Sequence, residues 1–200
     1  MDFQDVLRRR RMVRTFEPRP VDPEALERIL WAAQRAPSAG YSQGYAFLVL
    51  DRPEDVERFW SAAAHGEDEW PGDGLRRAPV VILPVAGKHV YLNRYAEPDK
   101  GWSDRDEARW PVPYWTVDAS FAAMLIQLAA IDQGLGALFF GLDAEGYGAV
   151  WEAFGVPGEW EPLGAIAIGH PATKDDVRSS AHSRPRKAAQ EVAHRGRWHG

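Results

Sequence analysis

The sequence of 200 residues predicts an α+β fold, in which one sheet is flanked by helices. Short apolar segments that indicate strands alternate with longer segments of helical periodicity. These strands are too few and too unevenly spaced for a regular series of parallel β–α–β units. A hydrophobic fraction of 45% can form a core without disulfides, and the chain has no cysteine. We therefore expect a single domain over residues 1–200.

The chain is expected to begin with a short helix and an extended segment. Asp2 can cap a helix that runs to about Arg10, and apolar residues recur along one of its faces. Residues 14–20 are then expected to be extended, because Pro18 and Pro20 interrupt any helix.

A second helix, a loop and a strand follow. Asp22 is an N-cap candidate, and Pro23 occupies the first helical position. Pro37 ends the helix, and the small residues of 38–44 indicate a loop. The apolar segment 45–50 is expected to be a strand.

The same periodicities assign the rest of the chain. Helices are expected at 53–64, 114–133 and 145–154, and strands at 79–86, 137–140 and 162–169. Polar segments with many glycines and prolines indicate loops at 65–77 and 95–113, and residues from 170 onward form a tail without core periodicity.

The helix at 114–133 is apolar on most sides, which predicts that a second subunit covers part of it. Its most apolar stretch, 119–131, is shorter than a membrane span requires. No secretory signal is visible near the start, where arginines lead into a polar segment. We therefore expect a cytoplasmic protein.

Charge is distributed unevenly along the chain. The net charge is −5, yet residues 1–19 carry a net +3 and residues 171–200 a net +4, so residues 20–170 carry −12. An acidic body argues against a nucleic-acid-binding protein. The two basic ends require another explanation, and a compact anion is the simplest one.

Arginines near the start are candidates for that anion. Four consecutive arginines at 8–11 cannot share one helix face, but Arg10 and Arg14 would do so if the helix continued. The planar guanidinium suits bidentate contacts to phosphate, although a solvated helix face is an equally good interpretation. The tail has a second basic cluster at 184–187, and Val192 and Trp198 could anchor it.

Three other motifs are weaker. Gly40 to Gly44 match the G-x-S-x-G nucleophile motif, but a helix precedes them and a strand follows, which reverses the required context. The pair Gly134 and Gly136 lacks the third glycine of a dinucleotide fingerprint and indicates a helix end and turn instead. The six histidines have no metal-binding spacing, so no metal site is expected.

Five segments in order resemble the nitroreductase family of FMN-dependent oxidoreductases. They are RRRRMVRTF, APSAGYSQGYAFLVL, GLGALFFG, PLGAIAIGHPA and the late RPRKAAQEVAHRGRW. The resemblance covers nearly the whole chain and implies a mostly antiparallel central sheet, an extended C-terminal arm at 171–200, and a homodimer. It also implies one FMN in each of two sites at the dimer interface.

The resemblance assigns FMN-binding residues by position. Those expected at the phosphate and the ring are Arg10, Arg11, Met12, Arg14, Ser38, Gly40, Gln43, Gly136, Leu138, Phe139, Arg184 and Arg186. Three departures from the family pattern stand out: Met12 replaces a serine, Tyr41 replaces an asparagine, and Gly44-Tyr45 replaces Pro-Trp. They bear on the ring contacts and the shape of the substrate site.

Aromatic residues are candidates for the substrate site. Tyr41, Tyr114, Trp115 and Phe139 could line the stacking face, with core packing as the alternative for each. Residues 95–113 would form a lid, and Trp102, Arg105 and Trp110 are its candidate contacts unless the segment is only a solvated loop.

The resemblance implies ping-pong hydride transfer from NAD(P)H through FMN to a small electron-poor acceptor, such as a nitroaromatic or a quinone. The chemistry belongs to the flavin, so no catalytic side chain is assigned. The alternatives are a specialised flavin enzyme (a dehydrogenase, a dehalogenase or a flavin-fragmenting enzyme) and a non-catalytic flavin-binding protein. Nucleic-acid binding is a third and weaker possibility.

Overall fold

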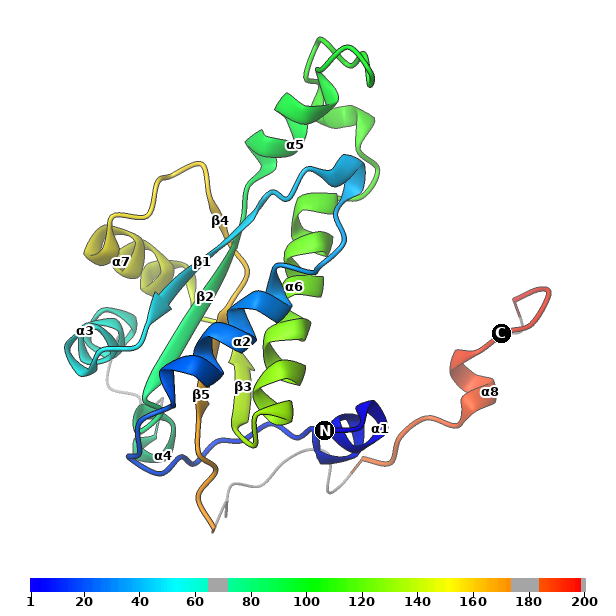
Figure 1. Ribbon diagram of the computed structural model, residues 1–200. Helices are drawn as coiled ribbons and strands as arrows, with labels where there is room; N and C mark the ends of the chain where they lie inside the picture. Colours follow the sequence, from blue (N-terminus) through cyan, green and yellow to red (C-terminus); the bar gives the residue numbers. More distant parts are fainter. Residues whose placement is uncertain (65–71, 174–183, 199–200) are drawn as a thin grey trace.

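The computed structural model describes residues 1–64, 72–173 and 184–198 and has the α+β class that the sequence predicts (Figure 1). Its core is a five-stranded sheet in the order β1-β2-β5-β3, with the short β4 also paired to β2. Each pair of strands in it is antiparallel. The strands are β1 (Tyr45–Leu50), β2 (Val80–Ala86), β3 (Gly136–Phe140), β4 (Glu161–Pro162) and β5 (Ala165–Gly169).

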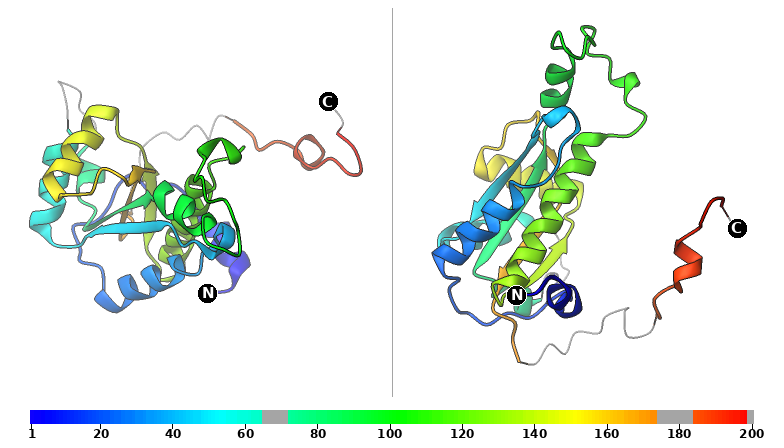
Figure 2. Two further views of the ribbon diagram at one scale, coloured as in Figure 1. Left: turned by 90° about the horizontal axis from the view of Figure 1, so that it is seen from above. Right: turned by 45° about the vertical axis from the view of Figure 1, so that its right-hand side comes forward.

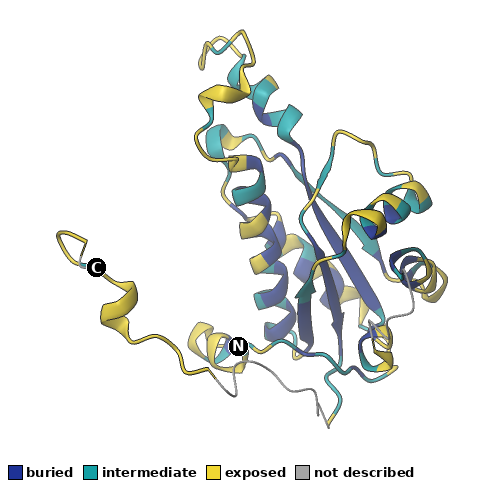
Figure 3. Cartoon of the chain, turned by 180° about the vertical axis from the view of Figure 1, so that it is seen from behind, coloured by how far each residue is buried: buried dark blue, intermediate teal, exposed yellow. Residues whose placement is uncertain are grey.

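Helices cover both faces of this sheet. In Figures 1 and 2, α2 (Pro23–Ala33) and α6 (Tyr114–Asp132) lie on one face, and α3 (Pro53–Ala63) and α7 (Ala144–Phe154) lie on the other. Because both faces are covered, every residue of β2 and of β5 is buried (Figure 3). This explains why the sequence of these strands is uniformly apolar rather than alternating.

Alternation along β2 divides the core into two clusters. Ile82 packs with Ile29 of α2 and Ile126 of α6. Its neighbour Leu83 points to the opposite face and belongs to the cluster that contains Trp60 of α3 and Val150 of α7. The sheet is therefore the middle layer of a three-layer arrangement.

Helix boundaries follow the capping signals. The Asp2 carboxylate accepts a hydrogen bond from the Gln4 amide at 2.8 Å and begins α1 (Phe3–Arg9). The Asp22 carboxylate caps α2 in the same way, through the Glu24 amide at 3.2 Å. Each cap satisfies an amide that lacks a partner in the first helical turn.

Two elements lie where the sequence analysis placed none. The helix α4 (Asp73–Arg76) occupies part of the segment expected to be a loop, because Leu75 is buried in the core; the remaining 65–71 lie outside the described residues. The helix α5 (Lys88–Tyr95) has little apolar periodicity and is held mainly by the buried Tyr91. Short helical turns also occur at η1 (Ala39–Tyr41), η2 (Glu107–Arg109) and α8 (Ala189–Val192).

The start of the predicted tail is in fact tied to the domain. Pro171 forms an isolated bridge with Phe16, and the Ala172 amide donates to the Thr15 carbonyl at 2.9 Å. The arm proper comprises the described residues 184–198, which stand away from the body of the molecule (Figures 1 and 2). Apart from His194, these residues are exposed.

The helix α6 is buried on one side within the chain, not all round. Its other side leaves Phe121 and Met124 each 47% exposed. By length (19 residues) and composition, α6 could cross a membrane. The expectation that its apolar stretch is too short for a membrane span is therefore wrong. Half of that span is buried, and α6 packs on the sheet as a core helix does. The cytoplasmic location stays a prediction.

Candidate functional site

The arginine-rich segment that follows α1 is extended. The helix ends at Arg9, so the shared helix face expected for Arg10 and Arg14 does not exist. In an extended segment, however, alternate residues point to the same side. Arg10, Met12 and Arg14 are half-buried, whereas Val13 between them is buried in the core. Strict alternation does not hold throughout, because Met12 also packs against the cluster that contains Val13. Arg10 and Arg14 flank Met12 in this extended segment, and the Arg14 guanidinium donates to the Met12 carbonyl at 3.3 Å.

The same segment lies beside the edge strand β3. Met12 forms a parallel bridge with Ala137, and the Val13 amide donates to the Ala137 carbonyl at 3.1 Å. At Gly136 a Cβ atom would lie 2.7 Å from the Val13 side chain. Close packing of the segment against β3 thus accounts for Gly136.

The remaining residues assigned to β3 contribute side chains to the core. Leu138 is buried in the cluster under α3 and α7, and Phe139 packs in the cluster under α2 and α6. Their side chains are thus engaged in packing, which favours the packing alternative for Phe139. The backbone of these residues remains the candidate for lining a bound ring, and the Phe139 side chain keeps partial exposure.

The loop 38–44 has an unusual backbone. Tyr41 has φ of 55° and Gln43 has φ of 50°, and Gly40 is also left-handed at 62°. For a residue with a side chain, such a conformation costs about 1–3 kcal/mol and persists only where surrounding contacts impose it. The Ser38 hydroxyl oxygen accepts from the Gln43 amide at 2.9 Å, which closes the loop on itself. As a result, the Tyr41 side chain is 76% exposed.

Contacts from α5 and α6 hold this loop. On α6, the Asp118 carboxylate accepts from the Ala39 amide at 2.8 Å and from the Tyr91 hydroxyl at 2.7 Å. From α5, the Arg94 guanidinium donates to the Gly40 carbonyl at 3.0 Å. No motif in the sequence pointed to Tyr91, Arg94 or Asp118, although an acid within an otherwise apolar helix could have indicated Asp118.

Burial alters the acid–base behaviour of two tyrosines near the loop. The pKa of Tyr91 is raised far above its usual range, first by burial and then by its hydrogen bond to Asp118. Burial, followed by the neighbouring Tyr41 and Asp118, also raises the pKa of Tyr45. Both hydroxyl groups act as hydrogen-bond donors, Tyr91 to Asp118 and Tyr45 to the Ala36 carbonyl at 3.3 Å.

Residues 95–113, which we call the aromatic cap, form mostly the expected exposed loop, with the turn η2 and a cluster of aromatic rings within it. The Tyr95 ring lies 4.5 Å from Trp110 and 5.0 Å from Trp102, centroid to centroid. Two ion pairs brace the segment, from Arg94 to Asp99 and from Arg109 to Asp104. Arg105 is exposed and has a positive φ of 53°. In Figure 1 the cap projects beyond the sheet with α5.

The aromatic residues proposed for the stacking face differ in how far they are exposed to solvent. Trp115 is only 4% exposed, and its indole N–H donates to Glu161 at 3.1 Å, which favours the packing alternative for this residue. Tyr41 and Tyr114 are exposed. Trp102 and Trp110 are partly covered by each other and by Tyr95.

The site residues lie at opposite ends of α6. Asp118 anchors the loop 38–44 near one end, and the ion pair between the Met1 amino group and Asp132 holds α1 at the other. These acids are 14 positions apart, which corresponds to about 21 Å of helix. Arg184 and Arg186 lie in the separate arm, so a single chain does not gather the two basic ends at one point.

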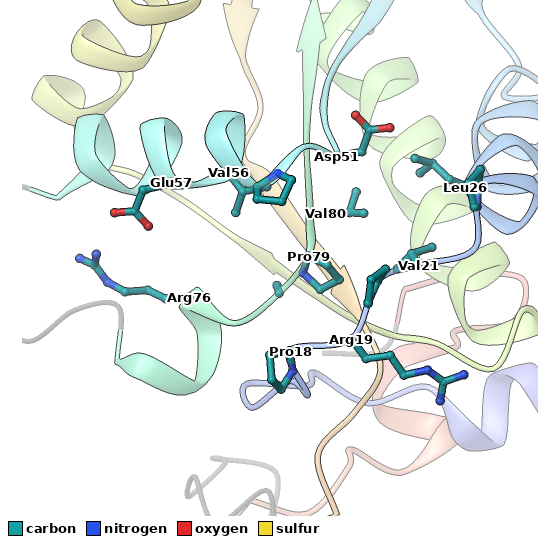
Figure 4. A pocket seen from close by; sticks show the side chains of 14 residues that line it. Pro18, Arg19, Val21, Leu26, Asp51, Val56, Glu57, Arg76, Pro79 and Val80 are labelled. Atoms are coloured by element: carbon teal, nitrogen blue, oxygen red, sulfur yellow. The ribbon is translucent and has the colours of Figure 1, made fainter.

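The cavities do not coincide with the whole predicted site. One cavity of about 420 Å³, shown in Figure 4, has an apolar lining with many prolines and none of the predicted site residues. Charges of both signs, including Glu57 and Arg76, lie around it. A smaller cavity of about 160 Å³ is lined in part by Arg9, Arg11 and Gly136, at the end of the molecule where the arginine-rich segment meets β3.

Known structures share this three-layer α+β arrangement. The NfrA1 nitroreductase of Bacillus subtilis superposes with a TM-score of 0.75 at 20% identity and covers 99% of this chain and 75% of its own. An FMN-dependent nitroreductase of Clostridium difficile R20291 has a TM-score of 0.69 at 24% identity, covering 96% of this chain and 98% of its own. These likenesses establish the class of fold.

The sequence establishes the family. A protein of Escherichia coli K12 that carries the name NAD(P)H nitroreductase YdjA is 31% identical over 186 residues, which cover 87% of this chain and 91% of that protein. The model of the nitroreductase family matches residues 7–170. The chain therefore belongs to the nitroreductase family and is an oxidoreductase.

Proposed function

We propose that this protein is a homodimeric oxidoreductase that binds FMN and transfers hydride from NAD(P)H to a small electron-poor acceptor in a ping-pong cycle. A nitroaromatic or a quinone is the proposed acceptor. Family membership supports the reaction class. The observation that carries the cofactor assignment is the pair Arg10 and Arg14, which are half-buried in an extended segment beside the sheet edge.

The donors of this segment fit the phosphate of FMN. A phosphate monoester carries close to two negative charges at neutral pH, and each guanidinium offers a rigid fork of donors. We assign Arg10, Arg11 and Arg14 to this phosphate, with Met12 beside it. When bound, FMN would supply the hydride chemistry. The chain's own residues bind and orient the cofactor and restrict water, and we assign no catalytic side chain.

A second subunit would complete the site. Phe121 and Met124 on α6 and Phe3 and Leu7 on α1 are exposed apolar residues, and the two helices contact each other. Exposed apolar patches are typical of interaction sites. We propose that the partner subunit covers it, and that the arm reaches across to bring Arg184 and Arg186 to the partner's phosphate. Exposed Val192 and Trp198 would anchor the arm.

The loop 38–44 would then meet the flavin ring through Ser38, Gly40 and Gln43, with the backbone of 136–139 at another edge. Tyr41 and Tyr114 are exposed and could stack on a flat acceptor, and Trp102 and Trp110 would form the nearby rim. Aromatic surfaces of this kind favour planar electron-poor molecules. This is why a nitroaromatic or a quinone is the preferred acceptor class.

The visible spectrum tests the cofactor directly. The purified protein, alone or with added FMN, is expected to show flavin absorption and quenched flavin fluorescence. NADH or NADPH should then bleach the flavin bands, and an added acceptor should restore them. A protein that never binds flavin would refute the proposal.

A specialised flavin enzyme is the second candidate, and the departure at Tyr41 favours it. A tyrosine in a left-handed conformation replaces the family's usual asparagine beside the proposed ring. Steady-state NAD(P)H oxidation with and without acceptors separates this candidate from a general reductase. Flavin that binds but is not reduced by either nucleotide would indicate a non-catalytic flavin-binding protein instead.

A further inference from the structure

We propose that Asp118 is a positioning residue, which acts with Tyr91 to hold the loop 38–44 in its left-handed conformation and so presents Tyr41 to the substrate. The proposal rests on the function proposed above, because it concerns the same loop. Asp118 does not itself touch the reacting groups. Its effect reaches them through the backbone of the loop.

The loop cannot hold this shape unaided. Three of its residues, Gly40, Tyr41 and Gln43, have φ between 50° and 62°, and only the first is a glycine. The closure from Ser38 to Gln43 fixes the turn internally but does not attach it to the domain. External contacts must therefore supply the stabilisation that the strained residues lack.

Asp118 supplies such a contact from the buried interior. The side chain is 3% exposed, and one oxygen, Oδ2, accepts both the Ala39 amide and the Tyr91 hydroxyl. A buried carboxylate is costly unless it is hydrogen-bonded, so both donors are needed to retain it. The bond to Ala39 ties the start of the loop to α6.

Tyr91 supports the other end of the loop. It is fully buried, and its ring lies so close to Gly44 that a Cβ atom there would collide with it. The Asp118–Tyr91 pair thus contacts the loop at both Ala39 and Gly44.

Contacts from α5 complete the support. The Arg94 guanidinium, which is paired with Asp99, donates to the Gly40 carbonyl. A Cβ atom at Gly40 would lie 2.7 Å from the Tyr95 ring, so this ring packs directly on the loop. With both ends and the middle fixed, the Tyr41 ring is directed away from the domain.

Hydrogen exchange of the full-length protein without added FMN tests the support itself. In peptides that cover 38–44, Asp118→Ala should exchange at least about tenfold faster, as expected for the loss of a hydrogen bond to a charged group. Asp118→Asn keeps an oxygen acceptor in place and should remain close to wild type. Tyr91→Phe keeps the ring but removes the hydroxyl, and the amides of 38–44 should also exchange faster in this variant. It replaces Asp118→Ala as the test if Asp118→Ala does not fold.

Val150→Ala is the control, because Val150 is equally buried but lies in the cluster on the other face of the sheet. It should lower the melting temperature without faster exchange at 38–44. If loop exchange in Asp118→Ala and Tyr91→Phe matches that of Val150→Ala, the positioning role is refuted.

Flavin titration then links the loop to function. Asp118→Ala should raise the dissociation constant of FMN and the KM for the acceptor by about tenfold. Asp118→Asn should restore both values to near those of the wild type, and Val150→Ala should leave both unchanged. If wild type binds no FMN, the proposed function fails, and the exchange data still decide the positioning role. If wild type binds FMN but Asp118→Ala binds it equally well, the positioning role alone fails.

Discussion

Arg10 and Arg14 show how the backbone determines what an arginine can do. Four arginines in a row could not all serve one anion, and the end of α1 at Arg9 decides between them. Beyond it, the chain is extended, and both Met12 and Val13 pack against the core. Arg10 and Arg14 are half-buried, whereas Arg11 is exposed and lines a small cavity with Arg9. We therefore expect the first two to contribute more to phosphate binding than Arg11.

Removing a phosphate ligand gives the prediction at this scale. Arg10→Ala and Arg186→Ala should each weaken FMN binding by about 1.5–3 kcal/mol, the range for hydrogen bonds to charged groups. Fluorescence titration with FMN measures the effect. Arg8→Ala is the matched control, because Arg8 is exposed and paired with Asp5. Unchanged affinity in both test variants would remove these arginines from the site.

A single glycine gives a second test. Gly136→Ala places a Cβ atom 2.7 Å from Val13 and 3.0 Å from Pro171, and should destabilise the fold by about 1–3 kcal/mol. Gly148 in α7 has nothing within 4 Å of such an atom, so Gly148→Ala should be stabilising by about 0.5–1 kcal/mol. Urea denaturation compares the two. Equal effects would mean that the arginine-rich segment does not pack on β3 as described.

At the scale of elements, the aromatic cap is a loop, as its proline-rich and charged composition predicted. Edge-to-face ring contacts and two ion pairs also give it a defined shape. The Arg94 guanidinium holds the pKa of Asp99 below its usual value, and Arg109 does the same for Asp104. The ordinary pKa of an aspartate is 3.8. Because the pKa values of Asp99 and Asp104 are lowered in the folded protein, the ion pairs stabilise the folded cap above pH 3.8. This stabilisation is lost as the pH falls below 3.8 and the two carboxylates become protonated.

Acidification is therefore expected to loosen the cap. Tryptophan fluorescence and near-ultraviolet circular dichroism should change as the pH falls through this range, and high salt should weaken the effect because the pairs are exposed. The double variant Asp99→Asn/Asp104→Asn provides the comparison, since it cannot form either pair. If it titrates like wild type over the same range, the ion pairs do not hold the cap.

At the scale of the whole molecule, the exposed side of α6 and the arm are the parts that one chain leaves incomplete. Phe121 and Met124 on α6 are apolar and exposed, as are Val192 and Trp198 in the arm. Exposed apolar patches mark interaction sites, and we propose that a partner subunit covers these residues. A second copy of the chain offers the same surface in return, as a symmetric dimer requires.

Charge on α6 should therefore disrupt the assembly. The double substitution Phe121→Glu/Met124→Lys is expected to shift the protein from dimer to monomer and to abolish FMN binding. Light scattering after size exclusion measures the first effect, and flavin absorption measures the second. Glu152→Lys on the exposed side of α7 is the control and should remain dimeric. A doubly substituted protein that stays dimeric would exclude this face as the interface.

Local signals in the sequence determined most of the elements and the family. Apolar runs placed the strands, Asp2 and Asp22 placed the starts of two helices, and five ordered motifs identified the nitroreductase family. These features depend on residues that are close in the chain, so they can be recognised without the fold. The positions proposed for FMN came from the same motifs.

Only the tertiary structure decided how the loop 38–44 is held and which aromatic residues remain accessible. Asp118 and Tyr91 lie 27 residues apart, and Ala39 lies 79 residues from Asp118, so no local pattern connects them. Trp115 and Tyr114 are neighbours in sequence, yet packing buries the first and leaves the second exposed. Such outcomes depend on contacts between distant segments, because burial and hydrogen-bond partners are properties of the folded chain.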